Sequence, residues 1–147
     1  MKTFVKFKKL SENAIVPRYG SEDAACADLY ACLTAPIYLN PGETKLVKTG
    51  IAMEIPQGLG GFIFARSGLA TKQGLAPANK VGVVDPDYRG EIMVALHNHS
   101  QETRTVCPGD RIAQIGFMPY VTAKFLEVDE LDSTDRGAGG FGSTGTK

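Results

Sequence analysis

The sequence predicts an all-β domain, a jelly-roll-like β-barrel or sandwich with one short helix and a flexible, glycine-rich C-terminal arm. Seventeen glycines and eight prolines divide the 147 residues into short segments. Within these segments apolar and polar residues alternate with a period of about two rather than about 3.6, which is the pattern of half-buried strands. Many short strands must bury their apolar faces against one another, so we expect a sandwich, a jelly roll or a small barrel.

The alternation predicts strands at residues 4–7, 28–32, 37–39, 45–55, 61–65, 81–84, 91–98, 103–106, 112–118 and 125–128. Pro and Gly fall close together at residues 40–42, 56–58 and 108–110, which is typical of tight turns. One short helix is expected, with Ser67 as its N-cap, residues 69–73 as its body and Gly74 as its C-terminal stop.

Length and composition indicate one β domain, residues 1–132, followed by an arm, residues 133–147. Sixteen basic and sixteen acidic residues cancel, so charge gives no reason to expect a nucleic-acid or membrane partner. The three cysteines, Cys26, Cys32 and Cys107, form no C-x-x-C pair, which favours a reducing compartment. With no signal peptide or membrane-spanning run in the sequence, we expect the cytoplasm.

Residues 136–145 combine glycine with Arg136, Phe141 and two hydroxyls, a mixture that suits a nucleoside polyphosphate. The run also matches G-x-G-x-x-G and nearly matches a Walker loop. Both of those folds need a helix after the glycines, and only five residues follow Gly142. The run therefore predicts an arm that closes over a nucleotide bound elsewhere; the alternative is a disordered glycine tail.

Three further segments carry polar groups that could bind or react. Arg66 lies between the end of a strand and the start of the helix, which predicts an anion site. The alternative is an ordinary helix start, in which Arg66 is a surface residue. Asp85 begins a turn at residues 85–88 between two apolar strands, which is either a simple hairpin or a tip that gathers reactive groups. Arg111 and Gln114 are an odd number of residues apart and are expected to face opposite sides of a strand, with Arg111 paired to an acid. The Gln114 amide would need a partner, for which a phosphate oxygen is a candidate.

Two signals are weaker. Asp28 alternates with apolar neighbours, and an acid in such a position is usually a turn or salt-bridge residue. His97 and His99 share a strand face, but no third ligand stands near them in the sequence, so surface histidines are favoured over a zinc site.

Taken in order, these segments resemble the five motifs of the homotrimeric dUTP pyrophosphatase (dUTPase) family. The motifs read Ala-Asp28-Leu-Tyr-Ala, Ala-Arg66-Ser67-Gly68-Leu-Ala, Gly82-Val-Val-Asp85-Pro-Asp-Tyr88-Arg-Gly90, Gly109-Asp-Arg-Ile-Ala-Gln114 and Arg136-Gly-Ala-Gly-Gly-Phe141-Gly-Ser143-Thr144. The resemblance covers nearly the whole chain. Two residues depart from the family pattern, Cys26 in place of a glycine and Pro86 in place of a small polar residue.

The resemblance implies a jelly roll that assembles as a homotrimer with active sites shared between three subunits. It implies hydrolysis of dUTP to dUMP and pyrophosphate, which limits uracil in DNA and supplies dUMP for thymidylate synthesis. Asp85 would be the general base for the water that attacks the α-phosphorus. Asp28 would hold Mg²⁺ through water.

The remaining roles implied by the resemblance concern substrate binding. Uracil would be read by Asn79 and the main chain of Val83 and Val84, with Met93 lining the same pocket. Tyr88 would pack against the deoxyribose and exclude a 2′-hydroxyl. Phosphates would be bound by Arg66, Ser67, Gly68 and Gln114, and the arm would close over the nucleotide with Arg136, Phe141, Gly142, Ser143 and Thr144.

Two other functions remain open at this point. A dCTP deaminase of the same fold would need an acid or base at the exocyclic amine of cytosine. A non-catalytic nucleotide-binding module would keep the phosphate motifs without a base. Ammonia release distinguishes the first and a turnover assay the second.

Overall fold

The structure is a computed structural model that describes residues 3–141. Its strands are β1 (Lys6–Lys9), β2 (Arg18–Tyr19), β3 (Ala27–Tyr30), β4 (Ile37–Leu39), β5 (Thr44–Glu54), β6 (Leu59–Phe64), β7 (Leu75–Pro77), β8 (Gly82–Val84), β9 (Glu91–Asn98), β10 (Arg104–Val106) and β11 (Arg111–Pro119). The helix α1 (Ser67–Gln73) lies between β6 and β7. No helix in this part of the chain is long and apolar enough to cross a membrane.

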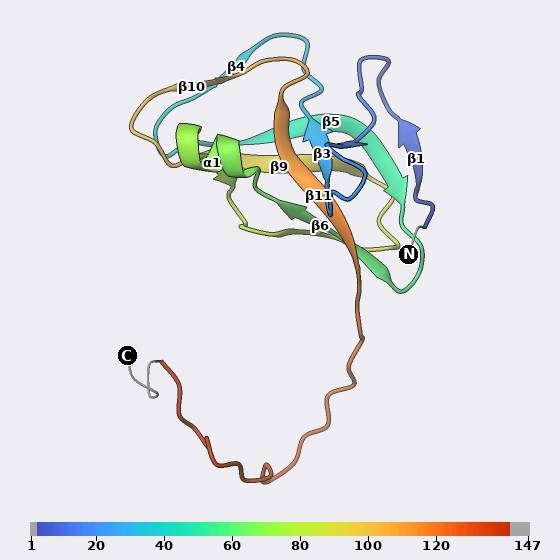
Figure 1. The fold of residues 1–147 in the computed structure, drawn as a ribbon, viewed down its shortest axis with the longest axis vertical. Helices are drawn as coiled ribbons and strands as arrows, with labels where there is room; N and C mark the ends of the chain where they lie inside the picture. The colour runs from blue at the N-terminus through green and yellow to red at the C-terminus, as the bar shows by residue number, and fades with distance from the viewer. Residues whose placement is uncertain (1–2, 142–147) are drawn as a thin grey trace.

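The strands form two main antiparallel sheets and one small one. The first sheet has the order β1-β5-β9-β7 and the second has the order β2-β3-β11-β6-β8, while β10 and β4 pair separately. The long strands β5, β9 and β11 cross the centre of the molecule (Figure 1). This arrangement confirms the predicted jelly-roll-like all-β fold.

The core lies where the inward side chains of the two main sheets meet. In β9 the even-numbered residues from Ile92 to Asn98 are buried and their neighbours are more exposed, which is the period of two expected of a strand with one face in the core. The largest fully buried apolar side chains come from both main sheets and from the β4–β10 pair. They are Leu29, Leu39, Ile51, Leu75, Ile92, Leu96, Ile112 and Ile115.

One buried polar residue, Asn98, links the end of β9 to β4 and to the loop before β10 by side-chain hydrogen bonds. Its side-chain amide donates to the carbonyls of Leu39 (2.9 Å) and Glu102 (2.8 Å). Its side-chain oxygen accepts from the backbone N–H (2.9 Å) and the hydroxyl (2.7 Å) of Ser100. All of its hydrogen-bonding capacity is thus used, which is the condition under which a fully buried amide is tolerated.

The predicted turns are confirmed. Gly42, Gly58 and Gly109 follow the prolines of the three predicted turns with φ of 76°, 87° and 81°, the left-handed region that glycine adopts most readily. Gly74 ends α1 in the same conformation, with φ of 68°, as expected. The N-cap assignment was wrong, because Arg66 is the N-cap and Ser67 is already helical.

Two other expectations were wrong, and two strands were missed. Residues 125–128 form no strand, since Phe125 and Leu126 are 100% and 85% exposed and nothing in the described chain pairs with them. β2 and β7 are too short, at two and three residues, for alternation to reveal them. β8 and β9 do not form a hairpin, because β8 pairs with β6 while β9 pairs with β5 and β7.

Candidate active site

Three neighbouring strands of the second sheet bring the expected phosphate and metal residues together. Gln114 of β11 lies opposite Asp28 of β3 on one side and Phe64 of β6 on the other. Arg66 follows the end of β6 by two residues, so its side chain is at the same end of the sheet. Its Nε donates to Asp28 Oδ1 at 2.8 Å. The Gln114 side-chain amide donates to the Ala65 carbonyl at 2.8 Å.

A β-bulge in β11 adds Arg111 to this group. Arg111 lies opposite Tyr30 and Ala113 lies opposite Leu29, so two steps along β11 match one step along β3. The extra residue reverses the alternation that follows it. Arg111 and Gln114 therefore face the same side, and the expectation that they face opposite sides was wrong. The expected partner of Arg111 is confirmed, since its Nη1 lies 3.3 Å from Asp28 Oδ2.

The Asp28 carboxylate consequently sits between two guanidinium groups, one on each oxygen. The Asp28 side chain is 14% exposed and the Arg66 side chain 26% exposed, so water screens this pair only in part. Arg66 Nη1 also donates to the Arg111 carbonyl at 3.4 Å. These contacts hold both guanidiniums in place while more of their N–H groups stay available to an anion.

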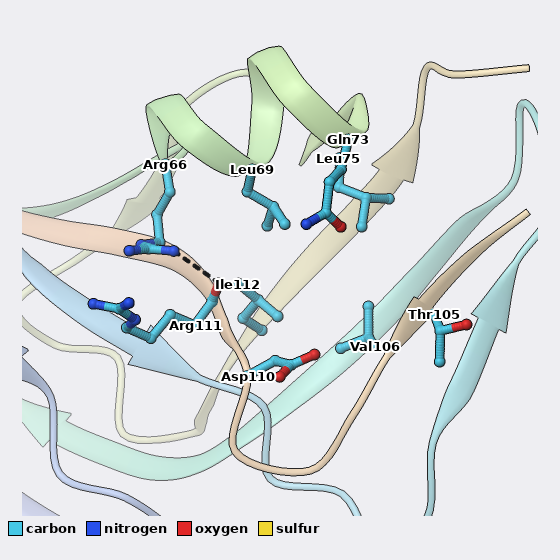
Figure 2. A pocket seen from close by; sticks show the side chains of 9 residues that line it. All are labelled: Arg66, Leu69, Gln73, Leu75, Thr105, Val106, Asp110, Arg111 and Ile112. Carbon is cyan, nitrogen blue, oxygen red and sulfur yellow. Dashed lines mark hydrogen bonds between the residues drawn. The ribbon is translucent and has the colours of Figure 1, made fainter. Parts of the chain in front are cut away.

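A pocket of about 230 Å³ opens beside the two arginines. Figure 2 shows Arg66 and Arg111 at one end of it, with α1 forming one wall. Ser67 and Gly68 are exposed at the start of that helix, and because Ser67 is not the N-cap, its hydroxyl is not used for capping. The other residues that line the pocket are Leu69, Gln73, Leu75, Thr105, Val106, Asp110 and Ile112.

Asp28 is the residue expected to hold Mg²⁺ through water. Within residues 3–141 no three His, Cys, Asp or Glu side chains gather into a group that could hold a metal ion. A carboxylate has about four acceptor positions, so Asp28 can still accept a hydrogen bond from a metal-bound water. The chemistry of this residue therefore fits an Mg²⁺ that Asp28 would hold through water.

The segment after β8 carries the expected base and sugar-binding residue. Asp85 is exposed and starts a turn that is closed by a 3.1 Å hydrogen bond from the Tyr88 N–H to the Asp85 carbonyl. The Tyr88 hydroxyl donates to the Glu91 carbonyl at 3.0 Å, so the ring folds back across Gly90. A Cβ at Gly90 would lie 2.6 Å from Tyr88 Cζ, which explains the glycine. Arg89 donates to the Pro86 carbonyl at 2.6 Å and stiffens the same turn.

The residues expected to bind uracil lie around β8 and the adjacent part of β9. Val83 is 62% exposed on the edge strand β8, whereas Val84 points into the core. The Asn79 amide lies next to Gly82, where a Cβ would be 3.4 Å from Asn79 Nδ2. Met93 is on the outward face of β9 and 38% exposed. An edge strand with exposed apolar residues and a nearby amide is suited to a flat base with a polar edge.

Asp85 and Arg66 lie at opposite ends of β6. β8 runs antiparallel to β6 with Val84 opposite Gly61, so Asp85 is level with Gly60, while Arg66 follows the other end of the strand. The backbone positions of Gly60 and Arg66 are separated by roughly 20 Å, at about 3.3 Å per residue. One chain therefore holds these two groups far apart along β6.

The structure does not bring the arm residues to either group. The chain leaves the sheets after β11 and runs away from them (Figure 1). Arg136 Nε donates to the Gly139 carbonyl at 2.9 Å within a local turn, and Phe141 is fully exposed. Gly142, Ser143 and Thr144 lie outside the described residues.

The cysteines and histidines stand apart from this chemistry. All three cysteines are free thiols, and burial raises the pKa of Cys26, which packs beside Gly116. His97 and His99 share a face as expected, with ring centroids 4.4 Å apart, and His97 Nδ1 is 2.7 Å from Thr44 Oγ1. Partial burial, then His97 and Lys80, lower the pKa of His99, so the ring is favoured in its neutral form.

Sequence reasoning missed the contribution of Arg111 and of Glu91. Arg111 was expected to be a simple ion-pair residue on the far face, and no local signal reveals the bulge that turns it toward Gln114. Glu91 is the first residue of β9 and was treated only as part of a strand, yet it contacts both Tyr88 and β5.

A family model described as dUTPase matches residues 12–145. The deoxyuridine 5'-triphosphate nucleotidohydrolase of Desulfitobacterium hafniense is 52% identical over 131 residues, covering 88% of this chain and 87% of the relative. The protein of the same name from Acinetobacter baylyi is 44% identical and both chains are covered completely.

Solved structures agree with these relatives. A variant of the Staphylococcus bacteriophage 80alpha dUTPase with dUpNHpp superimposes with a TM-score of 0.89 at 25% identity, covering 99% of this chain and all of the other. A dUTPase variant from phage phi11 of S. aureus, which coordinates a structural Mg(II) ion, has a TM-score of 0.78 at 25% identity, covering 87% and 98% of the two chains. The chain therefore belongs to the dUTPase family and is an enzyme, a dUTP diphosphatase.

Proposed function

We propose that this enzyme hydrolyses dUTP to dUMP and pyrophosphate by Mg²⁺-assisted attack of an Asp85-activated water on the α-phosphorus. The observation that carries the proposal is the pair of guanidiniums of Arg66 and Arg111 that Asp28 holds beside a pocket. Two fixed guanidiniums at a concave surface form a strong site for a polyphosphate.

The phosphate end of the substrate is assigned to the residues around this pocket. Arg66 and the exposed Ser67 and Gly68 would donate to phosphate oxygens, and the Gln114 amide would support them. Mg²⁺, when bound, would neutralise the charge that develops on the leaving pyrophosphate. Asp28 would orient the arginines directly and accept a hydrogen bond from a water of the metal.

The base and sugar are assigned to the segment from Asn79 to Met93. Asn79 and the main chain of Val83 and Val84 would bind the polar edge of uracil, and Met93 would cover the base. Tyr88 would pack on the deoxyribose. Asp85 begins the turn that carries Tyr88, so a carboxylate is held close to where the sugar and its α-phosphate would lie, which suits a general base.

The distance between Asp85 and Arg66 favours sites that are shared between subunits of a homotrimer. A site that needs both residues must take them from different copies, since within one chain they stand at opposite ends of β6. The exposed apolar residues after β11 favour the same conclusion, because Phe125, Leu126 and Leu131 are 85% exposed or more. Such a surface on an extended segment is suited to contact with a neighbouring subunit.

The arm and the cellular setting complete the proposal. Residues 133–147 would form an arm that closes over the nucleotide, with Phe141 on the base and Arg136, Gly142, Ser143 and Thr144 at the phosphates. Three free thiols suit a reducing cytoplasm. There the enzyme would keep dUTP low, limit uracil in DNA and supply dUMP for thymidylate synthesis. The equal numbers of basic and acidic residues give no support for a nucleic-acid partner.

The test is pyrophosphate release from dUTP, dCTP, dTTP and UTP side by side, with and without Mg²⁺, with ammonia measured in parallel. The proposal expects pyrophosphate from dUTP far above the other nucleotides, and loss of activity when Mg²⁺ is chelated. Ammonia release from dCTP would instead indicate a deaminase. No turnover of any nucleotide would indicate a binding module.

A further inference from the structure

Glu91 occupies a position that links the proposed sugar-binding residue to a deformed part of the neighbouring strand. It is the first residue of β9 and lies opposite Ala52 of β5. Two steps along β9, from Met93 to Glu91, match four steps along β5, from Lys48 to Ala52. β5 therefore bulges at residues 49–51, and the backbone groups in this bulge lose their regular partners on β9.

The Glu91 carboxylate replaces one of these lost partners. Glu91 Oε1 accepts a hydrogen bond from the Gly50 N–H at 2.9 Å, and Gly50 is buried. The N–H of a buried residue needs an acceptor, so this contact is costly to remove. The other oxygen, Oε2, lies 3.9 Å from Lys48 Nζ, which is a longer and more exposed ion pair.

The bulge is itself rigidly held. Gly50 has φ of 68°, and a Cβ there would lie 2.7 Å from Ala14 Cβ and 2.9 Å from Cys32 Sγ. The Gly50 carbonyl accepts from the Leu10 N–H at 2.8 Å, and the buried Thr49 hydroxyl donates to the Ile92 carbonyl at 2.6 Å. The bulge is therefore a fixed support for the start of β9.

The main chain of Glu91 in turn holds Tyr88. The Tyr88 hydroxyl donates to the Glu91 carbonyl at 3.0 Å, and the Tyr88 N–H closes the turn that starts at Asp85. Tyr88 is 43% exposed, so packing alone does not fix its ring. The position of the ring is set by the hydroxyl contact and by the place of the Glu91 carbonyl.

We propose that Glu91 is a positioning residue for sugar selectivity. Its carboxylate fixes the main chain at residue 91 against the β5 bulge, and the Glu91 carbonyl then fixes the Tyr88 ring at the distance that admits deoxyribose and excludes a 2′-hydroxyl. This inference rests on the proposed role of Tyr88. Glu91 touches no substrate in this arrangement and acts only through Tyr88.

The test compares kcat and KM for dUTP and UTP in the parent enzyme and in Glu91→Ala, Glu91→Gln and Lys48→Ala. Glu91→Ala is expected to lower the ratio of kcat/KM for dUTP over UTP roughly tenfold, since small displacements of a positioning group have large effects on reaction rates. Glu91→Gln keeps an oxygen for the Gly50 N–H and should restore most of the ratio. Lys48→Ala removes only the ion pair and should leave the ratio unchanged.

Two outcomes overturn the inference. If Glu91→Ala lowers kcat/KM for both nucleotides in parallel, or leaves the ratio as in the parent, Glu91 has only a structural role. Tyr88→Phe supplies a second measurement that does not depend on how well Glu91→Ala folds. It removes the hydroxyl contact from a partly exposed residue and should lower the same ratio, and a parental ratio in Tyr88→Phe also overturns the inference.

The double variant separates a shared mechanism from two independent defects. If Glu91 acts through Tyr88, adding Glu91→Ala to Tyr88→Phe should change the ratio little further. Fully multiplicative effects would contradict this. Failure of the proposed function would look different, because the parent enzyme itself would then show no preference for dUTP over UTP.

Discussion

Asp85 is the residue on which the proposed chemistry depends most directly. Its carboxylate is exposed at the start of a turn that is closed by a backbone hydrogen bond and braced by Arg89. The turn therefore presents the carboxylate without burying it, and bound dUTP together with the closed arm would have to exclude bulk water around it.

Replacing Asp85 by Asn keeps the size of the side chain but removes the base. We expect Asp85→Asn to bind dUTP with near-parental affinity and to lower kcat by about 10²–10⁴. Calorimetric titration with a non-hydrolysable analogue and pyrophosphate release measure the two quantities. Near-parental kcat in this variant would remove Asp85 from the mechanism.

Asn98 illustrates a residue whose importance is structural. Replacing it by Ala would remove the side-chain donor of the buried Leu39 carbonyl and the acceptor of the Ser100 N–H and hydroxyl. Because each unpaired buried group is costly, we expect Asn98→Ala to lower the free energy of unfolding by roughly 2–4 kcal/mol. Urea denaturation measures this quantity, and the exposed Asn13, replaced by Ala, is the matched control. Equal losses in both variants would contradict the assignment.

At the scale of elements, two bulges decide how the strands present their side chains. The bulge in β11 turns Arg111 toward Asp28, and the bulge in β5 exposes the Gly50 N–H to Glu91. The bulge in β11 reverses the alternation of the residues that follow it, and the bulge in β5 leaves a buried N–H for a side chain of β9 to accept from. Polar residues next to a bulge are therefore harder to place from sequence than core residues.

The arm, residues 133–147, is the second element for which we predict an effect on turnover. Five glycines between Gly137 and Gly145 make ordering of this segment costly, so nucleotide contacts should be needed to hold it closed. Closure would exclude water and align the α-phosphorus, which matters more for turnover than for binding. We expect removal of residues 136–147 to leave a folded protein that binds dUMP nearly as well as the parent but hydrolyses dUTP poorly.

Thermal unfolding, dUMP titration and pyrophosphate release together test this expectation. A Phe141→Ala variant of the full-length chain is the matched comparison, because it removes only the stacking group, whose contribution we place at about 1–3 kcal/mol. Parental turnover in the truncated protein would show that the arm has no part in catalysis.

At the scale of the whole molecule, the separation of Asp85 from Arg66 makes a prediction about assembly. Arg66→Ala and Asp85→Asn subunits should each be nearly inactive alone. If a site takes these residues from different subunits, an equal mixture that reassembles at random should recover about a quarter of the parental activity, because each residue is intact in half of the subunits.

The mixture is made by unfolding and refolding the two variants together, and mixed trimers are identified by a mass tag on one variant. Arg66→Ala mixed with Arg66→Ala/Asp85→Asn is the control, since no Arg66 is then present. Absence of recovery in proven mixed trimers would show that each site is built within one chain.

The fold class, the turns, the stop of the helix and the family all follow from the amino-acid sequence. These features depend on local signals: alternation along a strand, glycine where φ is positive, and residues of one motif close together in the chain. That is why Gly42, Gly58, Gly74 and Gly109 were placed correctly. For the same reason the five motifs are enough to name the proposed site residues.

The pairing of the strands and the relative positions of the functional groups, in contrast, depend on the three-dimensional structure. β8 and β9 are neighbours in sequence but lie in different sheets, and Asp28 meets Arg66 and Arg111 across 38 and 83 residues of chain. Strand pairing and bulges depend on contacts between distant residues, and a shift of one residue reverses every following side chain. For this reason the placement of Arg111, the contacts of Glu91 and the distance from Asp85 to Arg66 could not be predicted from the pattern of the sequence.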